Sequence, residues 1–377
     1  MEAVFLNVGI IVAILLFLMA TGTWLAFALY AVSIIALMFL GRGGMQGVLE
    51  GVLLNSIDSY TLVAIPLFIF MGEIIIMSGC SDSLFGGVKK ILGPLPGGLL
   101  HANILSCSIF AACSGSSTAT TVAVGGVAYP ELRKLGYAKR ITLGSICAGG
   151  TLGVLIPPSI MMILYGAMTN NSVGKLFIAG LIPGIVLAGM FMLYMAMACV
   201  LKPGLAPERS KFVGWAQYVK DFGAGLRNIW PIIVLIGGIM ISIYGGFATP
   251  TESAAVAIII AMIEWKFLYR TMTWELFVKA VEETVIITGQ LMIGIISARA
   301  LGMALSLLDI PRSLSIYVSE LPMSPYVVWA FIVLIYMVLG CLVDGIDLLI
   351  ISIPVFYPIM TSGLGFDPIW FGVAITI

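Results

Sequence analysis

The stretch GGTLGVLIPPSI, residues 149–160, lies between two long apolar segments of the chain. Pro157 and Pro158 each remove a backbone N–H donor and clash with the preceding turn of a helix. Three glycines shortly before them loosen the backbone further. Inside a membrane, non-helical backbone is tolerated only where it is buried in protein or lines a cavity. The stretch therefore predicts a membrane helix, at about residues 141–168, that is broken in its middle.

The composition of the chain predicts a polytopic membrane protein of the all-α class. Of its 377 residues, 61% are hydrophobic and only 10% are charged, whereas about a quarter of the residues in soluble domains are charged. The 18 Lys and Arg residues are balanced by 18 Asp and Glu residues, which argues against a nucleic-acid partner. The six cysteines are scattered without a CxxC pair, so we expect neither a disulfide framework nor a zinc site.

Apolar segments of the length needed to cross a bilayer, about 20 residues, recur along the chain. Basic residues cluster at 133–140, 202–227 and 266–279. Two crossings separate each cluster from the next, so all three can face the cytoplasm, as the positive-inside rule requires. We expect spans at about residues 3–19, 22–40, 60–79, 141–168, 176–200, 229–246, 252–268, 284–308, 327–343 and 346–361.

Residues 99–130 form two apolar arms around the polar sequence SGSSTATT. Each arm is too short to cross the membrane, which favours a re-entrant hairpin over two full crossings, although both would place the flanking charges on the same side. A second case is GCLVDGIDLLIISIPVFYPI, residues 340–359. There Asp344 lies either near the tip of a second hairpin, at about 327–361, or at an interfacial turn. An acid within an apolar run is a functional candidate by default.

The polar tip and the broken helix together predict a cation site. Ser and Thr hydroxyls and freed backbone carbonyls are hard oxygen ligands, which suit Na⁺ and are poor for soft metals. Small and hydroxyl-bearing residues also let membrane helices pack closely, so packing alone is the alternative for each segment. A Ser protease would need a base from another helix, whereas His101, the only histidine, lies on the same arm as the tip serines. We therefore expect no enzyme.

Two segments between the spans carry local structural signals. In the polar segment 201–228, Trp215, Tyr218 and Phe222 recur at helical spacing, which predicts a short amphipathic helix at the membrane surface. We expect this segment to connect two halves of the chain. The sequence TPTE at 249–252 resembles a helix start, with one of its threonines as the N-cap and its proline in the first turn.

A weak internal echo links the two halves. PELRKLGY at 130–137 resembles PIMTSGLGF at 358–366, because each has a proline followed by a glycine and an aromatic residue. The first copy is followed by the Pro-broken helix. Counting the same distance from the second copy places a second broken helix near position 386, beyond Ile377. If the echo is a repeat, we expect the second repeat to be incomplete in this chain.

Ordered motifs run essentially from one end of the chain to the other: AIPLFIFMGEIIIMSG, GPLPGGLLHANI, FAACSGSSTATT, ELRKLGY, GGTLGVLIPPSIMMILYG, LFIAGLIPG, GGFATPTESAAVA and LGCLVDGIDLLIISIPVFYPI. Through them the chain resembles the large membrane subunit of tripartite ATP-independent periplasmic (TRAP) transporters, the DctM-like group. The resemblance implies a multi-pass protein of the bacterial inner membrane. It further implies two inverted repeats, each with a re-entrant hairpin and a broken helix, and an elevator-type transport domain on a scaffold.

The resemblance also implies an activity and partners. A sodium gradient would drive uptake of an organic acid, such as a C4-dicarboxylate, a sialic acid or a keto acid, without ATP. A periplasmic binding protein would deliver the substrate, and a small membrane subunit would complete the complex within the lipid bilayer. A passive ion or anion channel and a non-transporting structural subunit are the alternatives from other classes. A channel would be expected to show rings of charge or a repeated filter motif, and the sequence shows neither.

The resemblance assigns roles to individual residues of this sequence. One Na⁺ site would use Ser114 and Ser116, with backbone carbonyls near Gly153, Ile156 and Pro158. Hydroxyls beside this site are candidates for substrate binding, and the acidic turn of the second half is the candidate for a second Na⁺ or substrate site. These further candidates are Ser117, Thr118, Thr151 and Ser159 for substrate, and Asp344 and Gly345 for the second site.

The expected domain organisation follows the two repeats. Each half begins with scaffold helices and continues into a transport repeat, and a connector joins the halves. The expected boundaries are 1–80 for the first scaffold part, 81–200 for the first transport repeat, 201–228 for the amphipathic connector, 229–310 for the second scaffold part and 311–377 for the truncated second transport repeat.

Overall fold

The structure is a computed structural model that describes residues 2–39, 51, 59–92, 95–202, 204–207, 214–320, 322–341 and 343–377. The described residues form helices joined by turns and short irregular segments, and none of them lies in a β-strand. The expected all-α class is confirmed. The chain divides into two compact units, each built from segments distant in sequence: Met1–Leu62, Leu164–Ser172 and Ile286–Thr376 form one, and Val63–Ile163 with Val173–Val285 form the other.

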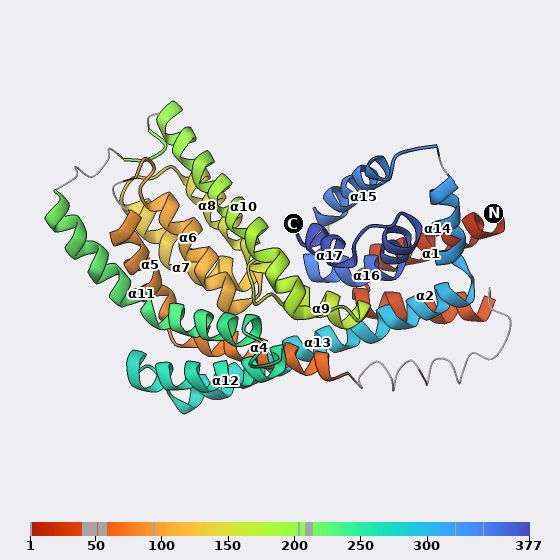
Figure 1. The fold of residues 1–377 in the computed structure, drawn as a ribbon, viewed down its shortest axis with the longest axis horizontal. Helices are drawn as coiled ribbons and strands as arrows, with labels where there is room; N and C mark the ends of the chain where they lie inside the picture. Colours follow the sequence, from red (N-terminus) through yellow and green to blue (C-terminus); the bar gives the residue numbers. More distant parts are fainter. Residues whose placement is uncertain are drawn as a thin grey trace. The chain divides into compact units, whose positions relative to one another are not determined.

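The second of these units is built around the first hairpin. Helix α6 (Leu99–Ser114) packs against α7 (Ser117–Lys134), and both pack against α8 (Lys139–Thr151). Figure 1 shows these helices together with α5 (Cys80–Leu92) in the orange-to-yellow part of the ribbon. Nearly every residue of α6 is buried, because the helix carries no carboxylate, lysine or arginine and is covered on several sides. The two arms expected at 99–130 are present as α6 and α7, and their re-entry into the membrane stays a prediction.

The broken helix is also confirmed. Helix α8 ends at Thr151, a single 3-10 turn (Leu152–Val154) follows, and α9 (Ile160–Thr169) resumes the helix after the prolines. The peptide bond between Pro157 and Pro158 is cis. The helix ends before the prolines themselves. The backbone carbonyls of the preceding turn would have to accept hydrogen bonds from N–H groups that proline lacks.

The remainder of this unit consists of long helices. They are α4 (Tyr60–Met77), α10 (Val173–Leu201), α11 (Trp215–Tyr244), α12 (Pro250–Ile263) with its π-helical extension (Glu264–Tyr269), and the first part of α13 (Trp274–Leu307). Thr249 caps α12: its hydroxyl accepts from the Glu252 N–H at 3.3 Å, and the Glu252 carboxylate accepts from the Thr249 N–H at 2.8 Å. The expected helix start at 249–252 is confirmed.

The expectation of a separate short helix in the connector 201–228 was wrong. The aromatic residues Trp215, Tyr218 and Phe222 lie on α11, which continues without interruption to Tyr244. The glycines after Phe222 do not end the helix. One of them, Gly225, instead allows α11 to pack closely against α5. A Cβ on Gly225 would lie 2.7 Å from the Gly87 carbonyl oxygen of α5, so the two backbones meet where no larger residue fits.

Two short helices were not expected from the sequence. Helix α5 carries Lys89, whose ammonium pairs with Glu131 of α7, and it buries Leu84, Phe85 and Val88 on one face. Helix α14 (Ile310–Glu320) is equally short and amphipathic. Neither has the uninterrupted apolar run by which spans are recognised, and the spacing of the buried residues of α5 was the signal that could have revealed it.

The other unit contains the second hairpin. Helix α15 (Pro325–Gly340) packs against α16 (Gly345–Pro358), which continues as a π-helical turn (Ile359–Gly363). The turn then contacts α14 and the final helix α17 (Pro368–Thr376). Helices α1 (Glu2–Ala20) and α2 (Leu25–Phe39) pack against each other, and α1 contacts α14. Asp344 lies in the turn between α15 and α16. Whether residues 327–361 form a re-entrant hairpin or place Asp344 at an interfacial turn stays a prediction.

The echo between the halves marks the same structural position in each hairpin. Gly136 follows the second arm of the first hairpin with φ +88°, and Gly365 follows that of the second with φ +74°. Glycine reaches such angles without steric cost. Each second arm also starts with a side-chain cap, from Ser116 in one hairpin and Asp344 in the other. The echo therefore reflects a repeated plan of hairpin, left-handed glycine and following helix.

Within the described part of the chain, five helices are long and apolar enough to cross a membrane. They are Tyr60–Met77, Val173–Leu201, Trp215–Tyr244, Trp274–Leu307 and Gly345–Gly363, and shorter apolar helices accompany them. The polytopic membrane class expected from composition is confirmed. The scaffold and transport boundaries expected at 1–80, 81–200, 229–310 and 311–377 stay predictions. The two compact units are defined by contacts, and each combines segments from both halves of the chain.

Candidate functional site

The turn of the first hairpin lies directly against the broken helix. Gly115 closes α6 in the left-handed conformation, with φ +60°, and its N–H donates to the Ala111 carbonyl at 2.8 Å. A Cβ on Gly115 would lie 3.2 Å from the Pro158 carbonyl oxygen and 3.1 Å from the Ile160 side chain. The glycine therefore serves both the turn and its close contact with the segment that follows the prolines.

A second glycine brings the other side of the break against the same turn. A Cβ on Gly153 would lie 2.9 Å from the Ser116 carbonyl oxygen and 3.2 Å from the Ser117 backbone nitrogen. Gly150 lies one turn earlier, and a Cβ there would be 3.2 Å from the Ser117 carbonyl oxygen. The structure thus places Gly153 next to Ser116 and Pro158 next to Gly115; that these residues bind Na⁺, as the resemblance implies, stays a prediction.

The prolines leave backbone carbonyls of the break without their usual helical partners. The carbonyls of Gly153 and Val154 would accept from residues 157 and 158, which have no N–H. The Ser159 hydroxyl replaces one of these donors, because it donates to the Val154 carbonyl at 2.5 Å. No hydrogen bond to the Gly153 carbonyl is present among the described residues.

The hydroxyls of the turn form a small cluster. The Ser114 hydroxyl lies 2.7 Å from that of Thr120 and donates to the Ser116 carbonyl at 3.3 Å. The Ser116 hydroxyl accepts from the Ala119 N–H at 3.3 Å and so caps α7. Ser114 and Thr120 are buried and Ser116 is half-buried. Thr120 was not expected at the site, although it belongs to the hydroxyl-rich run that predicted the tip.

The structure places the other candidates more peripherally. Ile156 directs its side chain at α10, where a Cβ on Gly184 would lie 2.9 Å from it. Thr151 is exposed and donates to the Ala148 carbonyl at 2.8 Å. Thr118 is exposed, and Ser117 contributes its carbonyl to a 2.8 Å hydrogen bond from Thr121. Ser159 is buried and supports the break through Val154. The ligand roles of Ile156, Ser117, Thr118, Thr151 and Ser159 stay predictions.

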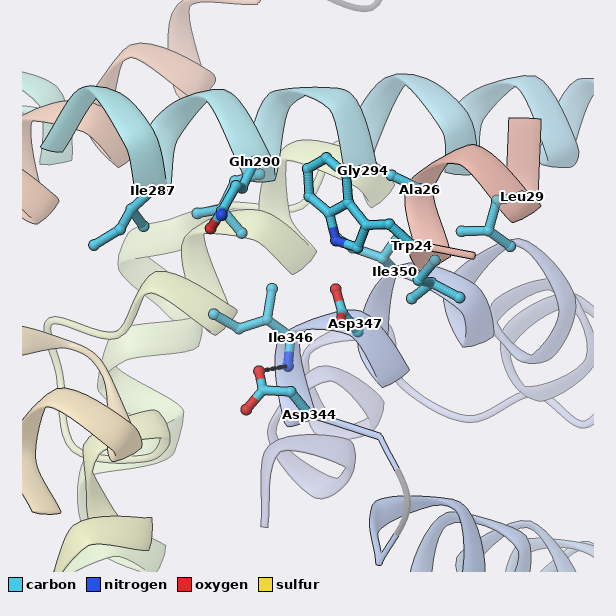
Figure 2. A pocket seen from close by; sticks show the side chains of 12 residues that line it. Trp24, Ala26, Leu29, Ile287, Gln290, Gly294, Asp344, Ile346, Asp347 and Ile350 are labelled. Atoms are coloured by element: carbon cyan, nitrogen blue, oxygen red, sulfur yellow. Dashed lines mark hydrogen bonds between the residues drawn. The ribbon is translucent and has the colours of Figure 1, made fainter. Parts of the chain in front are cut away.

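The acidic turn of the second hairpin borders a cavity of about 260 Å³. Asp344 is exposed, and its carboxylate accepts from the Ile346 N–H at 3.2 Å, which caps α16. Gly345 is the first residue of that helix. Figure 2 shows Asp344, Asp347, Gln290 and Trp24 around the cavity. Gln290 comes from α13 and Trp24 precedes α2, and no sequence motif links them to the acidic turn.

Comparison with known proteins places the chain in a family. The family model described as "Tripartite ATP-independent periplasmic transporter, DctM component" matches residues 12–377. The chain belongs to the DctM family. Its members named below are large permease proteins of TRAP transporters, and the resemblance stated from the sequence motifs is confirmed. Like other DctM proteins, this chain is an integral protein of the inner membrane that serves ATP-independent secondary transport of organic acids.

Three DctM relatives show the breadth of the family. The C4-dicarboxylate TRAP transporter large permease protein DctM of Pseudomonas aeruginosa is 34% identical, over 86% of this chain and 74% of its own length. The ectoine TRAP transporter large permease protein TeaC of Halomonas elongata is 31% identical, over 98% of this chain and 84% of its own. The sialic acid TRAP transporter large permease protein SiaM of Vibrio cholerae is 28% identical, over 94% and 81%.

Proposed function

We propose that this DctM protein couples the inward movement of Na⁺ to the uptake of an organic acid. The observation that carries the proposal is the contact between the first hairpin turn and the broken helix. There, Gly153 of the break leaves room for the Ser116 carbonyl, and Gly115 of the turn leaves room for the Pro158 carbonyl. Hydroxyl and carbonyl oxygens are the ligands that a hard cation such as Na⁺ prefers.

We assign the proposed Na⁺ site to oxygen atoms of the turn and of the break. They belong to the Gly153 carbonyl, the Ser116 carbonyl and the Ser114 hydroxyl, with Thr120 beside it. Ion binding would stabilise the contact between the turn and the break, because the ligands come from both segments. The substrate would then meet an ordered turn, and its affinity would rise with Na⁺ concentration, as linkage between two ligands requires.

The proposed assembly follows from the tripartite character of the family. A periplasmic substrate-binding protein would deliver the substrate, and a small membrane subunit would complete the membrane part. Relatives named for C4-dicarboxylate, sialic acid and ectoine transport support a carboxylate-bearing substrate. The hairpins and the break would belong to the part that carries substrate across the membrane by an elevator-type motion.

The proposal is tested by uptake into proteoliposomes that contain the full-length protein with its small subunit and binding protein. Candidate organic acids are compared with and without an inward Na⁺ gradient. We expect accumulation of one acid against its own gradient only when Na⁺ is supplied. Equilibration that ignores Na⁺ would mean a passive pore, and absence of uptake with every partner present would mean a non-transporting subunit.

A single hydroxyl tests the site within this assay. Ser114→Ala should weaken apparent Na⁺ affinity several-fold, because a hydrogen-bonding oxygen next to the turn is lost. Ser108→Ala is the matched control: it removes a buried hydroxyl from the same helix, and that hydroxyl donates to the Ile104 carbonyl at 2.8 Å. If both variants keep the wild-type sodium dependence, Ser114 does not bind the ion.

A further inference from the structure

The cavity beside α16 has a chemical character that the proposed sodium site does not explain. It is lined by the start of α16, by one side of α13 and by residues at and just before the beginning of α2. Two carboxylates, Asp344 and Asp347, and the Gln290 amide supply its polar atoms, and the Trp24 indole with several aliphatic side chains supplies the rest. Its volume of about 260 Å³ is enough for a small organic molecule and far exceeds a bare ion.

Asp347 is the distinctive group of this cavity. It is the third residue of α16, where an acidic side chain commonly folds back onto the backbone of the cap residue. Here the cap hydrogen bond runs from the Ile346 N–H to Asp344, and no hydrogen bond of Asp347 back to the cap is present among the described residues. Figure 2 shows the Asp347 carboxylate pointing into the cavity toward Trp24, and away from the Asp344 carboxylate. Asp344 therefore stabilises the helix as well as lining the cavity, whereas Asp347 has no capping role and faces the cavity.

The described residues that line the cavity carry no compensating positive charge. No Lys, Arg or His is among the described residues that enclose the cavity. A carboxylate is stable in such a place when an opposite charge lies near it, and a second anion there would be repelled. An indole face beside a carboxylate is a recurring way to bind organic cations, since the ring attracts positive charge. The Gln290 amide oxygen supplies a further acceptor for N–H donors.

We propose that this cavity binds a positively charged nitrogen group of a small organic molecule, with Asp347 as the ion-pair partner and Trp24 and Gln290 as its neighbours. The inference rests on the proposed transport function in one respect, that the bound molecule is the transported substrate. It specifies the substrate class as a zwitterion, an organic acid that also carries an ammonium or amidinium group. A simple dicarboxylate would place its second negative charge against Asp347.

The test compares two probes of similar length with opposite charge at one end. The full-length protein in lipid nanodiscs is titrated calorimetrically with γ-aminobutyrate, which has one carboxylate and one ammonium, and with succinate, which has two carboxylates. We expect γ-aminobutyrate to bind about tenfold or more tightly than succinate, since a hydrogen-bonded charge pair contributes enough for at least that factor. The preference should vanish in Asp347→Asn, which keeps the shape and removes the charge.

A control variant separates the charge of Asp347 from carboxylates in general. Asp221→Asn alters an aspartate on α11 that accepts from Gln217 at 3.0 Å, and it should leave the preference unchanged. Equal or tighter binding of succinate by the wild type, an undiminished preference in Asp347→Asn, or Na⁺ binding that is lost in Asp347→Asn would each overturn the inference. So would failure of both probes to bind.

The failure of this inference can be distinguished from failure of the proposed function. Sodium-driven uptake of a dicarboxylate, unaffected by Asp347→Asn, would leave the transport proposal standing and remove the cationic site. Binding of γ-aminobutyrate that depends on Asp347, in a protein whose uptake is independent of Na⁺, would support the cationic site and contradict the sodium-coupled transport proposal.

Discussion

Gly153→Ala is the most direct perturbation of the contact between the hairpin turn and the broken helix. An added Cβ would lie 2.9 Å from the Ser116 carbonyl oxygen, 3.0 Å from the Ser116 carbonyl carbon and 3.2 Å from the Ser117 nitrogen. All three atoms are backbone, so no flexible side chain can move aside. The turn or the break must shift to relieve the overlap. The displaced oxygens are those proposed to bind Na⁺.

The size of the effect follows from the cost of overpacking. Inserting a methyl group into a close-packed contact costs typically about 1–3 kcal/mol. If that strain is relieved by moving the turn away from the break, it appears as lost Na⁺ binding, because the ion needs both segments in place. A coupling of this size corresponds to roughly 5- to 150-fold in apparent Na⁺ affinity. The maximal rate at saturating Na⁺ should change less.

The assay is substrate uptake into proteoliposomes as a function of Na⁺ concentration, with thermal unfolding of the purified protein measured in parallel. Gly144→Ala is the matched control, since Gly144 lies on α8 and a Cβ there would have nothing within 4 Å. We expect wild-type sodium dependence from the control. A Gly153→Ala protein that is folded and shows the wild-type apparent Na⁺ affinity would refute the reasoning.

Two predictions concern stability. Gly87→Ala should lower the free energy of unfolding by about 1–3 kcal/mol, because its Cβ would lie 2.8 Å from the Gly225 carbonyl oxygen of α11; the adjacent Gly86→Ala has open space and should be neutral or stabilising in denaturant titrations. Equal effects of the two would contradict the close contact of α5 with α11. Thr249→Ala should cost about 1 kcal/mol by removing the capping box with Glu252, and Thr249→Ser should restore the loss in the same titration.

The parts of the fold that the sequence predicted are those decided by local chemistry. Pro157 and Pro158 interrupt a helix whatever surrounds them, because the missing N–H groups and the ring clash are properties of proline. The left-handed glycine after each hairpin, Gly136 and Gly365, was visible as the echo for the same reason. The capping box at Thr249 depends on only four consecutive residues.

The parts that the sequence did not predict depend on contacts between distant segments. Gly225 looks like a helix breaker in isolation, yet α11 continues through it. The contact with α5 supports the helix there, because the backbone of α5 occupies the space that a side chain at 225 would need. The pairing of Ser114 with Thr120 requires the backbone reversal at Gly115. Gln290 and Trp24 meet Asp347 only through the packing of three helices, and no spacing in the sequence encodes that meeting.

The two hairpins share a backbone plan but differ in the charge that they present. Ser116 caps the second arm of the first hairpin with a neutral hydroxyl, and Asp344 caps that of the second with a carboxylate, to which Asp347 adds another. Neutral oxygens crowded by glycines suit a small ion that must be stripped of water and released again. A pair of carboxylates beside an indole favours an organic cation, because the ring face and the charges both attract it. If both proposals hold, Na⁺ and a cationic substrate group need not compete for the same oxygens, because they bind at different hairpins.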